Sequence, residues 1–129
     1  QHNEQPGMIA FSSYEFINPH PEQTLQFIIQ STGKSHAIDV TLEINSSTTL
    51  DLRSSLKLGE ILKYDGGSEI ITYDASWHVL DKTAVNSQSM KIGQGPQSIN
   101  LGYRFEGNEP ALKLELRTIG EPTLLKASR

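Results

Sequence analysis

Apolar and polar residues alternate along most of the chain, a period-two pattern that predicts β-strands with one buried face and one solvated face. The alternation is regular in residues 25–29, 38–44, 99–105 and 112–117. In residues 38–44 the apolar stripe consists of Ile38, Val40, Leu42 and Ile44. Residues 50–58 contain a further stripe of Leu50, Leu52, Leu56 and Leu58. Strands of this kind are typical of antiparallel sheets, and two such sheets bury their apolar faces against each other.

Shorter runs predict more strands, and turn-forming residues separate all of them. The shorter runs lie at residues 8–14, 69–73, 77–80 and 122–126. Turn sequences such as Asp65-Gly66-Gly67 recur at a spacing of roughly 8–12 residues, as in sandwiches and barrels. No long stretch shows the apolar repeat of a helix. We therefore predict one all-β domain over residues 8–127, an antiparallel β-sandwich of about eight to ten strands, after a polar leader or linker at residues 1–7.

Composition and charge remove several classes of function. The chain has 129 residues and a formal net charge of −4. An acidic chain has no broad basic surface for nucleic acid or for anionic lipid. Its apolar runs are too short to form a membrane-spanning helix. It contains no cysteine, which excludes disulfides and thiolate metal sites. We expect neither nucleic acid nor a membrane as a partner.

Residues that could act in hydrolysis are present, but without the spacing of known catalytic motifs. No Gly-x-Ser-x-Gly sequence and no cysteine accompanies the four histidines. Four carboxylates fall in one stretch, where a pair could act as in glycosidases: Asp65, Glu69, Asp74 and Asp81. Asp65 and Asp74 begin predicted turns, however, where aspartate commonly accepts hydrogen bonds from its own backbone. Turn formation is therefore the favoured interpretation of both.

Signals for metal binding and modification are weak. Oxygen ligands leave a structural calcium ion open, although no EF-hand spacing is present. The histidines do not have the spacing of zinc ligands. We predict no other cofactor. Asn45-Ser46-Ser47 matches the acceptor sequence for N-glycosylation, a match that often occurs by chance.

The aromatic residues are the most informative candidates for a binding surface. Tyr64 and Tyr73 flank the turn at Asp65, and Trp77 follows the predicted turn that begins at Asp74. One interpretation is that Trp77 caps the end of the core. The other is that its ring stacks on the apolar face of a sugar, with planar polar groups around the ring. The candidates for those polar groups are Asp65, Asp74, Asn86, Gln88, Arg104 and Asn108.

A pattern of short motifs extends from Leu58 to Gly120. It comprises Leu58-Gly59-Glu60, Tyr64-Asp65-Gly66-Gly67, Ile71-Thr72-Tyr73-Asp74, Lys91-Ile92-Gly93-Gln94-Gly95, and the two long runs at 99–105 and 112–118. This pattern resembles that of accessory β-sandwich domains attached to secreted bacterial polysaccharide-degrading enzymes, many of which are jelly rolls of the galactose-binding type. The resemblance implies a jelly-roll-like sandwich, an extracellular or periplasmic location, and a non-catalytic role beside a catalytic domain of the same chain.

These observations leave three functional hypotheses. The first is a carbohydrate-binding or accessory module that binds a polysaccharide or oligosaccharide and has no catalytic residue. Its predicted ligand-binding residues are Trp77, Tyr73, Tyr64, Asp65, Asp74, Arg104 and Asn108. The second is a structural or protein-interaction sandwich that packs on a neighbouring domain and binds no sugar. The third is a small hydrolase that uses Asp65, Glu69 or Asp74.

Overall fold

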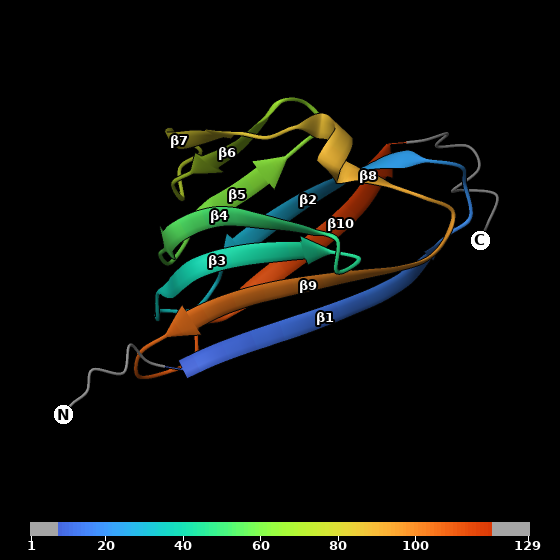
Figure 1. Cartoon of the computed structure of the whole chain (residues 1–129). Helices are drawn as coiled ribbons and strands as arrows, with labels where there is room; N and C mark the ends of the chain where they lie inside the picture. The colour runs from blue at the N-terminus through green and yellow to red at the C-terminus, as the bar shows by residue number, and fades with distance from the viewer. Residues whose placement is uncertain (1–7, 120–129) are drawn as a thin grey trace.

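Two antiparallel sheets build the protein, as seen in a computed structural model that describes residues 8–119 (Figure 1). The first sheet has the strand order β1-β9-β3-β4. Its strands are β1 (Met8–Asn18), β9 (Gly95–Phe105), β3 (Ala37–Ile44) and β4 (Thr48–Leu56). The second sheet has the order β10-β2-β5-β6-β7, and β8 pairs with the start of β2. Its strands are β2 (Gln23–Ser31), β5 (Ile61–Tyr64), β6 (Glu69–Tyr73), β7 (Val79–Ala84), β8 (Lys91–Ile92) and β10 (Leu112–Ile119).

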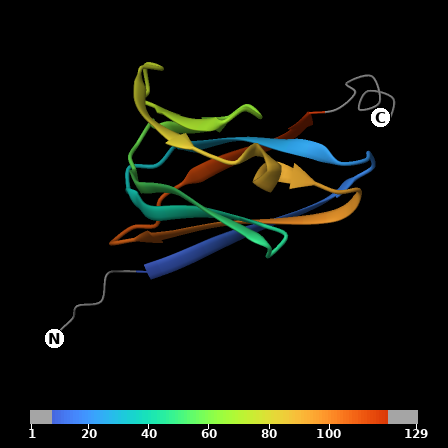
Figure 2. The same ribbon diagram turned by 45° about the horizontal axis from the view of Figure 1, so that its top comes forward.

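The all-β antiparallel sandwich predicted from the alternation is confirmed, and its ten described strands fall within the predicted number. The sheets lie one over the other (Figure 2), and their facing side chains form one apolar core. Leu25, Phe27 and Ile29 of β2 meet Leu42, Ile99 and Leu101 of the first sheet in that core. One short 3-10 helix, η1 (Ser87–Met90), precedes β8 and buries Met90. The predicted leader at residues 1–7 and the predicted strand at 122–126 lie outside the described residues.

A β-bulge corrects the predicted apolar stripe of β3. Asp39 has a φ of +52°, a left-handed conformation that aspartate tolerates better than most residues. The pairing of β3 with both neighbours shifts register between Ile38 and Thr41. An extra residue at a bulge reverses the alternation of faces. Ala37 is therefore buried, whereas Ile38 is only half-buried and pairs with Arg104. The prediction that Ile38 lies in the core is wrong.

Two predicted strand boundaries also need correction. Strand β4 ends at Leu56, so Leu58 lies in the following turn and is 55% exposed rather than part of the buried stripe. Strand β7 begins at Val79, so Trp77 and His78 belong to the turn before it and not to a strand. The sequence pattern did not predict β5 or β8, because each has too few residues to show an alternation. Among residues 8–119, no helix is long and apolar enough to cross a membrane.

Candidate functional site

The turn between β6 and β7 is fixed by the side chain of Asp74. Its Oδ1 accepts hydrogen bonds from the backbone N–H groups of Ser76 at 2.8 Å and of His78 at 2.9 Å. Its backbone carbonyl accepts a third from the N–H of Trp77 at 3.0 Å. The hydrogen bond from the His78 N–H is the main reason that the pKa of Asp74 lies below its ordinary value. Asp74 therefore acts as a turn residue, and its Oδ2 lies 3.3 Å from His78 Nδ1.

The indole of Trp77 stands on the surface of this turn. Trp77 has a φ of +66°, a left-handed conformation that is rare for a bulky residue. Its ring centroid lies 5.2 Å from that of Tyr73, with the two planes tilted by 58°. Ile70 and Thr72 of β6 are buried, so alternation places Tyr73 on the outer face of the second sheet. Because Trp77 is 55% exposed, the interpretation that it caps the core is wrong.

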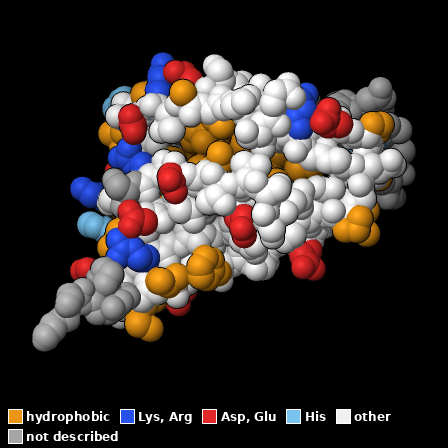
Figure 3. All heavy atoms as spheres, in the orientation of Figure 1, with side chains coloured by type: hydrophobic (Ala, Val, Ile, Leu, Met, Phe, Trp, Pro, Cys, Tyr) orange, Lys and Arg blue, Asp and Glu red, His pale blue; other side chains and the backbone are white. Residues whose placement is uncertain are grey.

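The Trp77 turn contacts the neighbouring turn between β4 and β5. A Cβ added at Gly59 would lie 2.9 Å from the Cβ of Ala75, so the two turns touch at this point. Leu58, Val79 and Leu80 are exposed apolar residues of the same two turns and of β7. These turns lie at the left end of the ribbon in Figure 1, and Figure 3, in the same orientation, shows charged side chains at that end. The surface around Trp77 is therefore partly apolar and partly charged.

Tyr64 and Asp65 do not belong to this surface. Tyr64 is only 1% exposed, its ring packs against Phe27 at a centroid distance of 5.8 Å, and its hydroxyl donates to the Gly67 carbonyl at 2.8 Å. Burial, and then the charge of Asp65, raise the pKa of Tyr64. Asp65 is exposed in the β5–β6 turn, at the opposite end of β6 from Trp77. The assignment of Tyr64 to the binding surface is wrong, because a buried ring cannot stack on a ligand.

The remaining polar candidates lie on other elements. Arg104 is on β9 of the first sheet, where its Nε donates to Asp39 Oδ2 at 3.0 Å. Asn108 is exposed in the loop between β9 and β10. Asn86 caps η1, because its Oδ1 accepts the backbone N–H of Gln88 at 3.0 Å. Of the predicted binding residues, Tyr73, Asp74 and Trp77 are the ones that the structure brings together in one turn.

Two of the carboxylates considered for hydrolysis, Glu69 and Asp74, are separated by strand β6. Glu69 and Asp74 lie at opposite ends of β6, five positions apart, which corresponds to roughly 16 Å of extended chain. Glycosidase pairs lie roughly 5–9.5 Å apart. Asp81, on β7, forms an ion pair with Arg53 of β4 at 3.2 Å. In residues 8–119 no three His, Asp or Glu side chains are grouped as metal ligands would be, and the structural calcium ion stays a prediction.

Asn45 of the glycosylation acceptor sequence has a structural role in the β3–β4 turn. Its φ is +53°, a conformation that asparagine adopts more readily than most residues. Its side-chain amide donates to Gln97 Oε1 at 2.7 Å, and its Oδ1 accepts the backbone N–H of Ser98 at 2.7 Å. The amide of Asn45 therefore ties this turn to β9.

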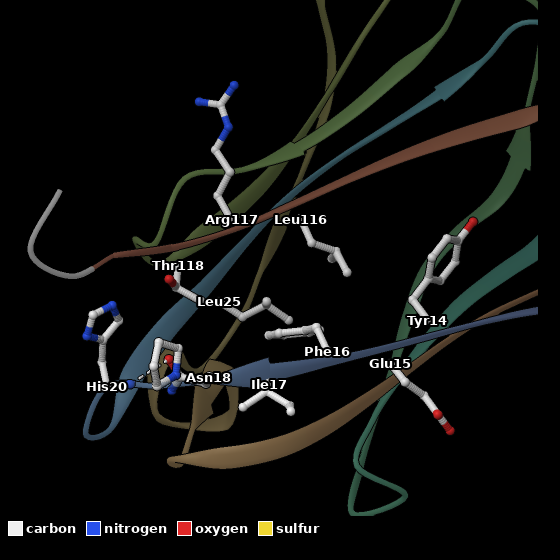
Figure 4. Close-up of a pocket in the computed structure, with 11 residues that line it drawn as sticks. Tyr14, Glu15, Phe16, Ile17, Asn18, His20, Leu25, Leu116, Arg117 and Thr118 are labelled. Atoms are coloured by element: carbon white, nitrogen blue, oxygen red, sulfur yellow. Dashed lines mark hydrogen bonds between the residues drawn. The ribbon is translucent and has the colours of Figure 1, made fainter. Parts of the chain in front are cut away.

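A groove that the sequence did not reveal runs along the open side of the sandwich, between β1 and β10 (Figure 4). Its volume is about 560 Å³. Tyr14, Phe16, Leu25 and Leu116 point into it from the two sheets, and His20 lies at one end. The one signal in the sequence was His20 itself, which stands between two prolines. Pattern analysis cannot show which sheet edges lie next to each other, because that depends on the topology.

Comparison of the sequence with models of known protein families, with curated proteins and with solved structures found no match.

Proposed function

We propose that the chain is a non-catalytic carbohydrate-binding module, which binds a polysaccharide or oligosaccharide against the ring of Trp77. The observation that carries the proposal is an exposed tryptophan whose ring packs at a tilt against that of Tyr73, in a turn fixed by Asp74. An exposed aromatic ring offers an apolar surface to the C–H face of a sugar. A ring that is already held in place loses little conformational entropy when the ligand binds.

Polar groups for the sugar hydroxyls surround the ring. The side chain of His78 is 79% exposed next to Trp77, and its ring nitrogens can donate or accept. Oδ2 of Asp74 is a further acceptor on the same turn, because the two backbone hydrogen bonds use Oδ1. The turn lies at an end of the sandwich (Figure 1), and the side chain of Trp77 is exposed there.

The proposed role follows from weak binding combined with tethering. As an accessory domain of a secreted bacterial enzyme, the module would keep the polysaccharide near a catalytic domain of the same chain. Linking two binding units in this way raises the effective concentration of substrate without a new contact at the catalytic site. No residue of this chain needs to take part in bond cleavage.

The experiment is a titration of tryptophan fluorescence with a panel of soluble glycans: xylan, mannan, β-glucan, pectin and arabinan. Trp77 is the only tryptophan, so the signal has one source. We expect a saturable change with one class of glycan, lost in Trp77→Ala when binding is followed by affinity electrophoresis. Phe11→Ala is the matched control, because it removes an exposed aromatic ring from β1 on the other sheet. Unchanged glycan binding by Trp77→Ala, or no binding to any glycan, refutes the proposal.

Packing on a neighbouring protein domain is the second candidate, favoured by the exposed apolar side chains of Leu58, Val79 and Leu80 beside Trp77. Burying such side chains in an interface would be favourable. A Val79→Asp variant separates the two candidates. A glycan that stacks on Trp77 should still bind this variant, whereas an apolar protein contact should be lost. Two measurements on this variant are compared. One is its binding to insoluble glycan, and the other is the change in its sedimentation coefficient when it is mixed with the neighbouring domain.

A further inference from the structure

Charged side chains are divided unevenly between the two sheets. The strands of the first sheet carry four carboxylates and two cationic side chains, namely Glu15, Asp39, Glu43, Asp51, Arg53 and Arg104. The strands of the second sheet carry the carboxylates of Glu69, Asp81 and Glu115, and five cationic side chains: Lys63, Lys82, Lys91, Lys113 and Arg117. Arg53 and Asp81 form an ion pair with each other across the two sheets. The second sheet therefore has an excess of positive charge, in a chain whose net charge is −4.

The five cationic side chains of the second sheet lie on its outer face. Alternation along the strands places four of them there, because their neighbours in the sequence are core residues or pack against the core: Leu62, Tyr64, Ile92, Leu112, Leu114 and Leu116. The fifth, Lys82, pairs with Ile71, which lies between the buried residues Ile70 and Thr72 of β6. The same alternation leaves only the carboxylates of Glu69 and Glu115 on the outer face of these strands.

The lysines of this face have no carboxylate opposite them. Pairs of opposite charge on neighbouring strands stabilise a sheet, and the lysines make none of them. The cross-strand pairs are instead Lys63–Ile28, Lys63–Ile71, Lys82–Ile71, Lys91–Thr24 and Lys113–Gln30. Within residues 8–119 these four lysines form no ion pair, whereas Arg117 lies 3.7 Å from Glu115. Their ammonium groups are therefore available to an anionic ligand.

One row of paired residues leads from the Trp77 turn across the sheet towards these charges. The row runs from Val79 through Tyr73, Ile61 and Gln30 to Lys113. Neighbouring strands lie roughly 4.8 Å apart, so the three spacings from Tyr73 to Lys113 amount to roughly 14 Å. Lys63 is two residues from Ile61 on the same face of β5, next to the middle of the row. A polymer that stacks on Trp77 and follows the row therefore passes two ammonium groups.

We propose that the glycan bound at Trp77 is a polyuronate, an acidic polysaccharide whose carboxylates contact Lys63 and Lys113. This inference rests on the proposed glycan binding and adds the chemical class of the ligand. Single ion pairs on an exposed face are weak, but a charge that repeats along the polymer engages several of them at once. Glu69 lies four positions from Tyr73, roughly 13 Å along β6, and so does not repel a chain that follows the row.

The experiment compares two polyuronates, polygalacturonate and alginate, with methyl-esterified polygalacturonate, which keeps the sugar backbone and lacks the charge. Binding to the full 129-residue chain is followed by the fluorescence of Trp77. We expect both polyuronates to bind more tightly than the ester, and their Kd to rise as NaCl screens the charges. Lys63→Gln and Lys113→Gln should each raise the Kd of polygalacturonate roughly 1.5- to 5-fold.

Lys91→Gln is the matched control, because it removes the same charge from the same face at a distance from the row. Lys91 pairs with Thr24, and Lys113 pairs with Gln30. These two partners are six positions apart on β2, which corresponds to roughly 20 Å. This distance is about twice the screening length at roughly 0.1 M salt. Lys91→Gln should therefore leave the Kd of polygalacturonate unchanged.

Three results would overturn the ligand class and leave glycan binding at Trp77 standing. The first is binding of the ester, or of a neutral glycan, as tightly as both polyuronates. The second is an unchanged polygalacturonate Kd in both Lys63→Gln and Lys113→Gln, or an equal rise in Lys91→Gln. The third is tighter binding of a single-stranded oligonucleotide, which would make the face a general surface for polyanions. If no glycan binds, acidic or neutral, the proposed function itself is refuted.

Discussion

Replacing Gly59 by alanine tests whether the Trp77 turn is held by its neighbour. Gly59 has a φ of +83°, and an added Cβ would lie 2.9 Å from the Cβ of Ala75. Two costs therefore act together at this position. One is the left-handed backbone, which side chains other than that of glycine rarely tolerate. The other is a steric clash with the methyl group of Ala75, which cannot move away because it is bonded directly to the backbone of the β6–β7 turn.

Gly107 separates these two costs. Its φ is +78°, but an added Cβ there meets no atom within 4 Å in the described part of the chain. Alanine in this conformation costs about 1–2 kcal/mol, of which the stiffer unfolded chain offsets about 0.4–1 kcal/mol. Gly107→Ala should therefore lower the free energy of unfolding by about 0.5–1 kcal/mol. At Gly59 an overpacking cost of about 1–3 kcal/mol is added, so Gly59→Ala should lower the free energy of unfolding by about 1.5–4 kcal/mol in total.

The assay is equilibrium unfolding in urea, followed by far-UV circular dichroism and by Trp77 fluorescence, with the slope m compared among the variants. Adding Ala75→Gly to Gly59→Ala removes the clash. The double variant should therefore regain the overpacking part of the lost free energy of unfolding, and keep only the backbone cost that Gly107→Ala measures. The double-mutant cycle should therefore give a coupling of about 1 kcal/mol or more. Equal losses in Gly59→Ala and Gly107→Ala, or no recovery in the double variant, would refute the contact between the two turns.

Three further predictions concern the core, the tyrosines and the bulge. Leu42→Ala should lower the free energy of unfolding by about 2–5 kcal/mol, and exposed Leu58→Ala by less than about 0.5 kcal/mol; similar losses in urea would contradict the assigned burial. Burial raises the pKa of Tyr64 and Tyr103, so these tyrosines ionise at a lower pH in the unfolded chain than in the folded one. The free energy of unfolding should therefore fall as the pH rises from about 10 through the pKa values of the folded state. An ultraviolet titration in which both tyrosines ionise like free tyrosine would contradict this. Asp39→Val should melt well below Asp39→Asn in calorimetry, since valine resists a positive φ; equal melting would remove the argument for strain.

The sequence was sufficient to predict the long strands and the fold class, because the period of two marks which face of each strand is buried. The stripes of β2, β9 and most of β3 follow that rule. It failed at Ile38 because a single bulged residue reverses the alternation without changing the composition of the strand. It also failed at Leu58, where the chain leaves the strand and the same leucine lies in a turn. Alternation cannot show where a strand ends when the first apolar residue after the strand, here Leu58, still follows the two-residue spacing.

The candidate site was predicted less completely, since aromatic residues beside turns look alike in a sequence. Tyr64 and Trp77 both flank turns, yet one is buried and the other is on the surface. The difference arises from the side of the sheet on which each ring lies, and from the positive φ of Trp77. The partners of Arg104 and Asn45 are distant in the sequence, so their roles could not be read from their local motifs.

The position of Trp77 at a sheet edge explains why its turn needs so many local contacts. Strand β7 contributes no buried residue, so the core does little to hold it. What holds the turn is the carboxylate of Asp74, the contact between Gly59 and Ala75, and the ion pair of Arg53 with Asp81 that links β4 to β7. An exposed ring can bind a rigid polymer only if the turn beneath it keeps its shape. Loosening these contacts should therefore weaken the proposed glycan binding at Trp77 even in variants whose core remains folded.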